Sequence, residues 1–253
     1  MNEFPVLLSI PHGGRKIPHE LKNQLCINDR DLFDDSDPFV IEIYDIGDKA
    51  KTIIKTEIAR AFVDLNRAPN DLPPKNPDGV IKSTTCYNKS IYSKQPDEAL
   101  RKILIKSYYE PYHKEILKNI KKYDFKICLD CHSMASVAPN ISPDGNNAKR
   151  PSFCISNQNG KTSTNQMMDH LAECISESFS ISIEQISKNN PFYGGYITQT
   201  YGNKQLPWIQ IEMNRDLYLN KQWFDESTLK IDPARLTKLN ECFEKTLEIF
   251  FQK

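Results

Sequence analysis

The sequence predicts one α/β domain of three layers, with a twisted, mainly parallel mixed sheet and helices on both faces. Short apolar runs alternate with helical patterns along the chain, which is typical of this class. The 253 residues fit one large domain, and the chain shows no internal repeat, low-complexity linker or domain boundary. We therefore expect a single domain over residues 1–253.

The elements follow in order along the chain. FPVLLSI (4–10) predicts the first strand, and residues 37–50 predict a helix with Asp37 as its N-cap and Pro38 at its first position. Residues 97–123 have apolar side chains at helical spacing, and Pro111 should kink that helix. The remaining predictions are strands at 51–58, 60–65, 125–130, 152–156 and 207–213, and helices at 165–179 and 232–251.

The composition excludes several classes of function. Lys+Arg and Asp+Glu are equal at 33 each, so there is no net basic field to recruit nucleic acid or an anionic membrane. No apolar stretch approaches the roughly 18 residues that a membrane span needs, and the first residues lack the pattern of a signal peptide. Seven cysteines, an odd number, indicate reduced thiols. We therefore expect a cytoplasmic protein that binds neither nucleic acid nor a membrane.

The pair Cys128 and Cys131 in CLDC suggests a redox or metal motif at first sight. It lies in an apolar run that predicts a strand, however, and residues three apart on a strand point to opposite faces. The two sulfurs would then be unable to converge, and we do not expect a CxxC site.

Polar side chains gather where the predicted strands end. His12 follows the first strand, Asp64 ends AFVD, and His132 and Glu212 lie in or just beyond later apolar runs. Ligands of open α/β sheets bind at the carboxyl ends of the strands. Two histidines and a carboxylate around an open position suit a catalytic zinc, and a second carboxylate suits a general base. The alternative is that each histidine is a hydrogen-bonded core or loop residue.

Two long irregular stretches also stand out, over residues 66–96 and 133–151. Both are rich in residues that favour turns, and the first contains several prolines. Loops of this length inside a compact domain usually cover or line a binding site. We expect both to border the site at the sheet edge.

Six segments carry the residues of a known set of motifs in order. They resemble the motifs of the N-formylglutamate amidohydrolase family and span roughly 210 of the 253 residues, which is far more specific than one short pattern. The segments are SIPHGGRKIP (9–18), DSDPFVIEIYD (35–45), ARAFVDLNRAP (59–69), LDCHSM (129–134), PFYGGYITQTYG (191–202) and IQIEMNRDLYL (209–219).

The resemblance implies a fold like that of the zinc exopeptidases and aspartoacylases, and hydrolysis of N-formyl-L-glutamate to formate and glutamate. The wider fold uses a His and a Glu three residues apart as metal ligands, but the residue three after His12 is Arg15. Asp37 is the preferred replacement, with Asp35 as the alternative; an Asp-Pro helix cap also explains Asp37. Zn²⁺ would then be held by His12, Asp37 and His132.

The resemblance also implies roles for the residues around that metal. Glu212 would take the proton from the attacking water, and Asp130 would accept a hydrogen bond from His132. The candidates for stabilising the oxyanion or binding the substrate carboxylates and backbone are Arg60, Asn66, Arg67, Arg215, Tyr196 and Thr198. For Arg15 and Arg150 we expect solvated surface positions instead.

Two other functions remain open on the sequence. One is a metallo-amidase or peptidase for a larger substrate, such as a cell-wall peptide. The other is a non-catalytic module that binds carboxylates on a hydrolase fold, which the predicted buried base Glu212 disfavours.

Overall fold

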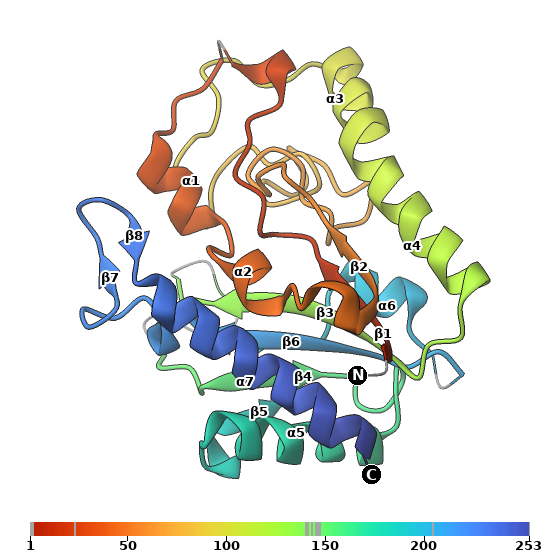
Figure 1. Cartoon of the computed structure of the whole chain (residues 1–253). Coiled ribbons are helices and arrows are strands. Elements are labelled where there is room, and N and C mark those ends of the chain that lie inside the picture. The colour runs from red at the N-terminus through yellow and green to blue at the C-terminus, as the bar shows by residue number, and fades with distance from the viewer. Residues whose placement is uncertain are drawn as a thin grey trace.

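The computed structural model describes residues 3–22, 24–139, 142, 144, 148–203 and 205–252. It confirms the predicted class, a single α/β domain built on a mixed, mostly parallel sheet (Figure 1). Six strands lie in the order β2-β1-β3-β6-β4-β5, and the β4–β6 pair is antiparallel while the other neighbours are parallel. The strands are β1 Phe4–Ile10, β2 Ala50–Lys55, β3 Ile127–Met134, β4 Phe153–Ser156, β5 Ile186–Lys188 and β6 Trp208–Asn214.

Helices cover both faces of this sheet. One face packs against α2, α5 and α7, and the other against α3, α4, α6 and the segment from Ala59 to Tyr92. Figure 1 shows α3 and α4 as one long rod that flanks the sheet, with α5 and α7 on its other side. The helices are α1 Asp29–Asp35, α2 Val40–Tyr44, α3 Glu98–Leu104, α4 Glu110–Lys122, α5 Asn165–Phe179, α6 Tyr196–Tyr201 and α7 Pro233–Gln252, and a small second sheet pairs β7 Phe224–Asp225 with β8 Lys230–Ile231.

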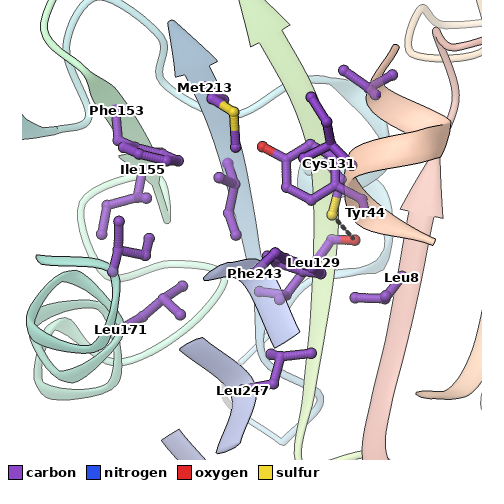
Figure 2. Close-up of a cluster of buried hydrophobic side chains, with 14 of the residues drawn as sticks. Leu8, Tyr44, Leu129, Cys131, Phe153, Ile155, Leu171, Met213, Phe243 and Leu247 are labelled. Atoms are coloured by element: carbon purple, nitrogen blue, oxygen red, sulfur yellow. Dashed lines mark hydrogen bonds between the residues drawn. The ribbon is translucent and has the colours of Figure 1, made fainter. Parts of the chain in front are cut away.

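The alternation of side chains along β3 builds both halves of the core. Leu129 and Cys131 face α2 and α7, where Tyr44 and Phe243 meet edge to face at 4.8 Å between ring centroids (Figure 2). Cys128 faces the opposite cluster, so the two cysteines of CLDC lie on opposite faces of the sheet as predicted. The same alternation leaves Asp130 and His132 on one face, which positions the site described below.

Several element predictions need correction. The helix expected over residues 37–50 covers only Val40–Tyr44, and its N-cap is Phe39, in the left-handed region with φ of 64°, rather than Asp37. Residues 60–65 form turns instead of a strand, so Asp64 does not end a strand. Between α3 and α4, residues Ile105–Tyr109 form a π-helical segment directly before Pro111. A π turn there suits proline, which has no N–H to donate.

The other expected elements agree with the structure to within a few residues. The predicted helix at 165–179 is α5, capped by Thr164, whose hydroxyl accepts a hydrogen bond from the backbone of Met167. Residues 66–96, all of them described, contain neither helix nor strand, as the irregular sequence predicts. Helix α1, helix α6, strand β5 and the β7–β8 pair were not anticipated. No helix among the described residues is long and apolar enough to cross a membrane.

Candidate metal and catalytic site

Three buried side chains converge at the carboxyl edge of the sheet. His12 lies two residues beyond β1, His132 lies in β3, and Asp37 lies just before α2. The Nδ1 atoms of the two histidines are 3.0 Å apart, and Asp37 Oδ2 is 3.1 Å from Nδ1 of His132 and 3.5 Å from Nδ1 of His12. Three potential ligand atoms therefore form a small triangle.

The size of this triangle fits a metal. Ligand atoms at about 2.1 Å from a tetrahedral zinc lie about 3.4 Å from one another. The three observed separations of 3.0, 3.1 and 3.5 Å bracket that value. The residue types are also those that bind zinc, so the chemistry and the spacing agree.

The second nitrogen of each imidazole is held by a carboxylate. His12 Nε2 lies 2.7 Å from Asp64 Oδ1, and His132 Nε2 lies 3.1 Å from Asp130 Oδ2. Such partners fix the ring orientation and place the proton on Nε2, which leaves the Nδ1 lone pair for a metal. The hydrogen bond expected between Asp130 and His132 is present, whereas the partnership of Asp64 with His12 was missed by sequence reasoning.

The structure brings Asp37 rather than Asp35 to the histidines. The backbone N–H of Asp37 donates to the carbonyl of His12 at 3.2 Å, which fixes this residue beside the strand end. Burial raises the pKa of Asp37, but hydrogen bonds and charge from His12 and His132 outweigh burial and leave that pKa well below its usual range. The Asp37 carboxylate is therefore ionised and able to act as a ligand.

Asp35 is committed elsewhere. Its carboxylate accepts hydrogen bonds from Lys82 Nζ at 2.9 Å and from the backbone of Cys86 at 2.6 Å. Lys82 is fully buried and also pairs with Asp78 at 2.7 Å. Asp35 therefore ties the long loop to α1 and lies outside the group of three potential ligands.

Glu212 lies in β6, opposite His132 in the register of the two strands. Gln210, two residues earlier on the same face, donates a hydrogen bond to its carboxylate at 2.8 Å. Burial raises the pKa of Glu212 to about 7. A buried carboxylate with a pKa near neutrality, next to the three potential ligand atoms, has the chemistry that a general base requires.

Guanidinium groups surround the cluster. Arg60 pairs with Asp64 at 3.0 Å, and Arg215 pairs with Asp37 at 3.1 Å. The side chain of Arg67 is 37% exposed, and it pairs with Asp78 at 2.5 Å. These arginines balance the buried carboxylates. Arg215 donates to Asp37 Oδ1, and the backbone N–H of Ser133 donates to Asp37 Oδ2 at 3.2 Å.

A cavity of about 580 Å³ opens above the cluster. The predicted ligands, Glu212 and the predicted substrate-binding residues line it except Tyr196 and Thr198, and Asp130 is also absent from its lining. Thr198 is buried and its hydroxyl donates to Asp130 at 3.4 Å, while the ring of Tyr196 packs against His113. The cavity also has Asp78, Cys86 and Tyr87 from the 66–96 loop in its wall, so that loop borders the site as expected.

Two predictions about arginines have different outcomes. Arg15 is exposed as expected, with its guanidinium 4.5 Å from the ring centre of Phe39. Arg150 is not solvated: its side chain is 4% exposed, pairs with Asp144 at 2.8 Å and lies in the cavity wall. A nearby carboxylate and the ring of Phe192 make this burial possible, and neither contact was visible in the sequence.

Asn66 connects the site to α6. Its side-chain nitrogen donates to Asp130 at 3.1 Å and lies 3.0 Å from His132 Nε2, and its oxygen accepts from the backbone of Ile197 at 2.7 Å. A Cβ on Gly195 would lie 2.3 Å from the Asn66 nitrogen, so only glycine allows this approach. Asn66 therefore holds the histidine–carboxylate pair, and this role was not anticipated.

The sheet, its helical layers and the charged groups at the carboxyl edge define an α/β fold of the zinc exopeptidase-like class. Residues 4–219 match the model of the N-formylglutamate amidohydrolase family, and the chain belongs to that family. It is therefore a member of a family of hydrolases that act on amide bonds.

Two solved structures are similar over nearly the whole chain. N-formylglutamate amidohydrolase from Ralstonia eutropha JMP134 is 19% identical with a TM-score of 0.80, covering 100% of this chain and 94% of that chain. A gene product from Agrobacterium tumefaciens is 19% identical with a TM-score of 0.66, covering 97% and 91%. At this identity the likeness supports the fold alone. A search of curated proteins finds no match.

Proposed function

We propose that this protein is a zinc-dependent amidohydrolase that converts N-formyl-L-glutamate and water into L-glutamate and formate. The observation that carries the proposal is the triangle of His12 Nδ1, His132 Nδ1 and Asp37 Oδ2 beside the buried carboxylate of Glu212. The family of the chain supports the amide-bond chemistry and the substrate. The proposal includes a cytoplasmic location, which the odd number of cysteines supports.

His12, His132 and Asp37 would hold the metal through one nitrogen each from the histidines and one carboxylate oxygen. When bound, a divalent metal supplies Lewis acidity that polarises the acyl carbonyl and acidifies water. Asp64 and Asp130 keep the two rings in the orientation this requires.

Glu212 would carry the proton. As a carboxylate it accepts a proton from the attacking water, and it then donates that proton to the leaving nitrogen of the amino acid. The N–H donors of Arg60 and Arg215 would stabilise the developing oxyanion, while Arg67, the more exposed arginine, would bind a substrate carboxylate. N-formylglutamate has two carboxylates, which matches a cavity with several arginines.

Metal analysis and a formate assay on the purified protein test the proposal together. We expect about one divalent metal per chain, formate release from N-formyl-L-glutamate, and loss of both on chelation. His12→Ala should lose metal and activity, whereas Glu212→Gln should keep the metal and lose activity. His19→Ala, an exposed histidine away from the cluster, is the matched control and should keep both.

Two results would contradict the proposal. One is the absence of formate and of every other deacylation from a panel of N-acyl amino acids. The other is equal ligand affinity in the wild type and Glu212→Gln with no turnover in either, which would support a carboxylate-binding module instead.

A further inference from the structure

The cavity is larger than the proposed substrate requires. Its volume of about 580 Å³ lies in the middle of the roughly 300–1,000 Å³ typical of sites for drug-sized ligands. N-formylglutamate is a much smaller molecule than such ligands. The room that remains over the cluster therefore needs an explanation beyond the formyl group.

The cavity wall has two chemically different parts. One part contains Arg60, Arg67 and Arg215, which lie against the carboxylates of the cluster. The other part contains Met134, Ala135, Phe192 and Tyr193. The charge of Arg150 within this second part is offset by Asp144, and its guanidinium lies 4.9 Å from the ring centre of Phe192.

This division orients an N-acyl amino acid. The carboxylates of such a substrate belong to its amino-acid portion, and the three arginines attract them. The scissile carbonyl must lie at the three ligand atoms. With the carboxylates bound by the arginines, the apolar side chains of the wall are the matching contacts for the acyl group.

The apolar part continues to the protein surface. Tyr87 and Tyr193, which line the cavity, are 52% and 42% exposed. A second hollow of about 370 Å³ shares Tyr87, Ala135 and Pro139 with the cavity, and Val137 in its wall is 42% exposed. Large exposed apolar side chains that gather at the mouth of a cavity mark a binding surface.

We propose that this apolar wall, made of Met134, Ala135, Phe192, Tyr193 and Tyr87, binds an apolar acyl group longer than formyl. The substrates are then N-acyl acidic amino acids whose acyl chain extends from the cluster toward the cavity mouth. This inference rests on the proposed amidohydrolase function and specifies its substrate class.

A homologous series tests it. The probes are N-formyl-, N-acetyl-, N-butyryl- and N-hexanoyl-L-glutamate, assayed for kcat/KM with the metal-loaded protein. Burial of each methylene against the wall should raise kcat/KM roughly two- to fourfold, so the hexanoyl substrate should exceed the acetyl one by more than tenfold. A steady fall in kcat/KM from formyl to hexanoyl would overturn the inference.

Variants locate the effect. Tyr193→Ala and Tyr87→Ala should each lower the ratio of kcat/KM for hexanoyl over formyl substrate by about three- to tenfold. Leu117→Ala removes a side chain that is 44% exposed on α4, away from the cavity, and should leave the ratio unchanged. An equal ratio in all three variants and the wild type would contradict the role of the wall.

The two proposals fail in different ways. If only the formyl substrate is hydrolysed, the proposed binding of longer acyl groups is contradicted, but the proposed amidohydrolase function is not. If no member of the series is hydrolysed, the amidohydrolase function is contradicted. Calorimetry then measures the binding of the same series to Glu212→Gln. Affinity that rises with the length of the acyl chain supports the proposed acyl-binding wall, and constant affinity overturns it.

Discussion

At the residue scale, each histidine of the cluster has two distinct nitrogen environments. Nε2 of His12 and of His132 meets a carboxylate, and Nδ1 of each faces Asp37. A neutral histidine that only fills the core needs one hydrogen-bond acceptor for its N–H and one hydrogen-bond donor for its other ring nitrogen. Two Nδ1 atoms 3.0 Å apart compete for a single proton, and a shared cation satisfies both lone pairs.

The titration of Glu212 predicts the acid limb of the pH profile. Burial raises the pKa of Glu212 to about 7, and only its ionised form accepts a proton. We expect kcat/KM to rise with pH and to level off above an apparent pKa at or below about 7, since a bound cation lowers that pKa. Rates from pH 4.5 to 9 check this, and a profile flat over the whole range would contradict it.

Removal of the same carboxylate predicts the size of its contribution. Glu212→Gln keeps the hydrogen-bonding shape of the side chain but has no basic form. We expect kcat to fall by about 10²- to 10⁴-fold with metal content unchanged. Steady-state kinetics and metal analysis measure the two quantities, and a loss of metal in this variant would assign Glu212 to the ligand set.

Lys82 predicts a large effect on stability. It is fully buried between Asp35 and Asp78, at 2.9 and 2.7 Å. Lys82→Met leaves the buried carboxylate of Asp35 and the partly buried carboxylate of Asp78 without this partner. It should lower the free energy of unfolding by about 3–5 kcal/mol. Urea denaturation measures this change.

The matched control is an ion pair on the surface. Lys102 pairs with Glu98 on α3, and both side chains are more than 70% exposed. Lys102→Met should change the free energy of unfolding by about 0–1 kcal/mol. Equal effects of Lys82→Met and Lys102→Met would show that the buried pairs contribute no more than exposed ones.

At the scale of elements, the site is formed by residues at the ends of strands and at or just before the starts of helices. Strands β1, β3 and β6 run parallel, so their carboxyl ends bring His12, His132 and Glu212 to one edge. The approach to α2 adds Asp37, and the start of α6 approaches Asn66 so closely that Gly195 has no room for a side chain. Each element contributes one position, and none of them forms the site alone.

The contact between α6 and Asn66 gives a prediction at this scale. Gly195→Ala would place a Cβ 2.3 Å from the Asn66 nitrogen and displace that side chain from Asp130 and His132. We expect kcat/KM to fall by about 10- to 100-fold, as for other partners of metal-binding histidines. A double-mutant cycle with Asn66→Ala checks the route, because Gly195→Ala should then cost little more. Additive losses would contradict it.

At the scale of the whole molecule, the cluster joins segments that are distant in the chain. His12 follows β1, Asp37 precedes α2 and His132 lies in β3, and the sheet and both helical layers fix their separation. A metal bound there cross-links these segments only in the native state. Metal binding should therefore stabilise the whole domain.

Thermal unfolding measures this coupling. At a free Zn²⁺ concentration about 100 times its dissociation constant, the native state gains about 2.7 kcal/mol, which raises Tm by about 5–10 °C for a domain of this size. Chelation should reverse the shift, and His132→Ala should abolish it. An equal rise of Tm in His132→Ala would show that zinc stabilises the protein elsewhere.

The amino-acid sequence alone predicts the class of the fold, most of the strands and the convergence of His12, His132 and Glu212. These follow from hydrophobic period and from the geometry of parallel strands, which are local properties. It also determined the family, because ordered motifs identify it without any geometry.

The tertiary structure was needed to bring Asp37 rather than Asp35 to the histidines, to pair Asp64 with His12 and to bury Arg150, and it leaves Tyr196 outside the lining of the cavity. Asp35 is held by Lys82, which is 47 residues away, and Asp64 meets His12 across 52 residues. Arg150 packs on Phe192 in addition to its near neighbour Asp144, and the packing of α6 places Tyr196. Local sequence gives the chemical type of a side chain, whereas its partner is set by the packing of distant segments, which no local pattern encodes.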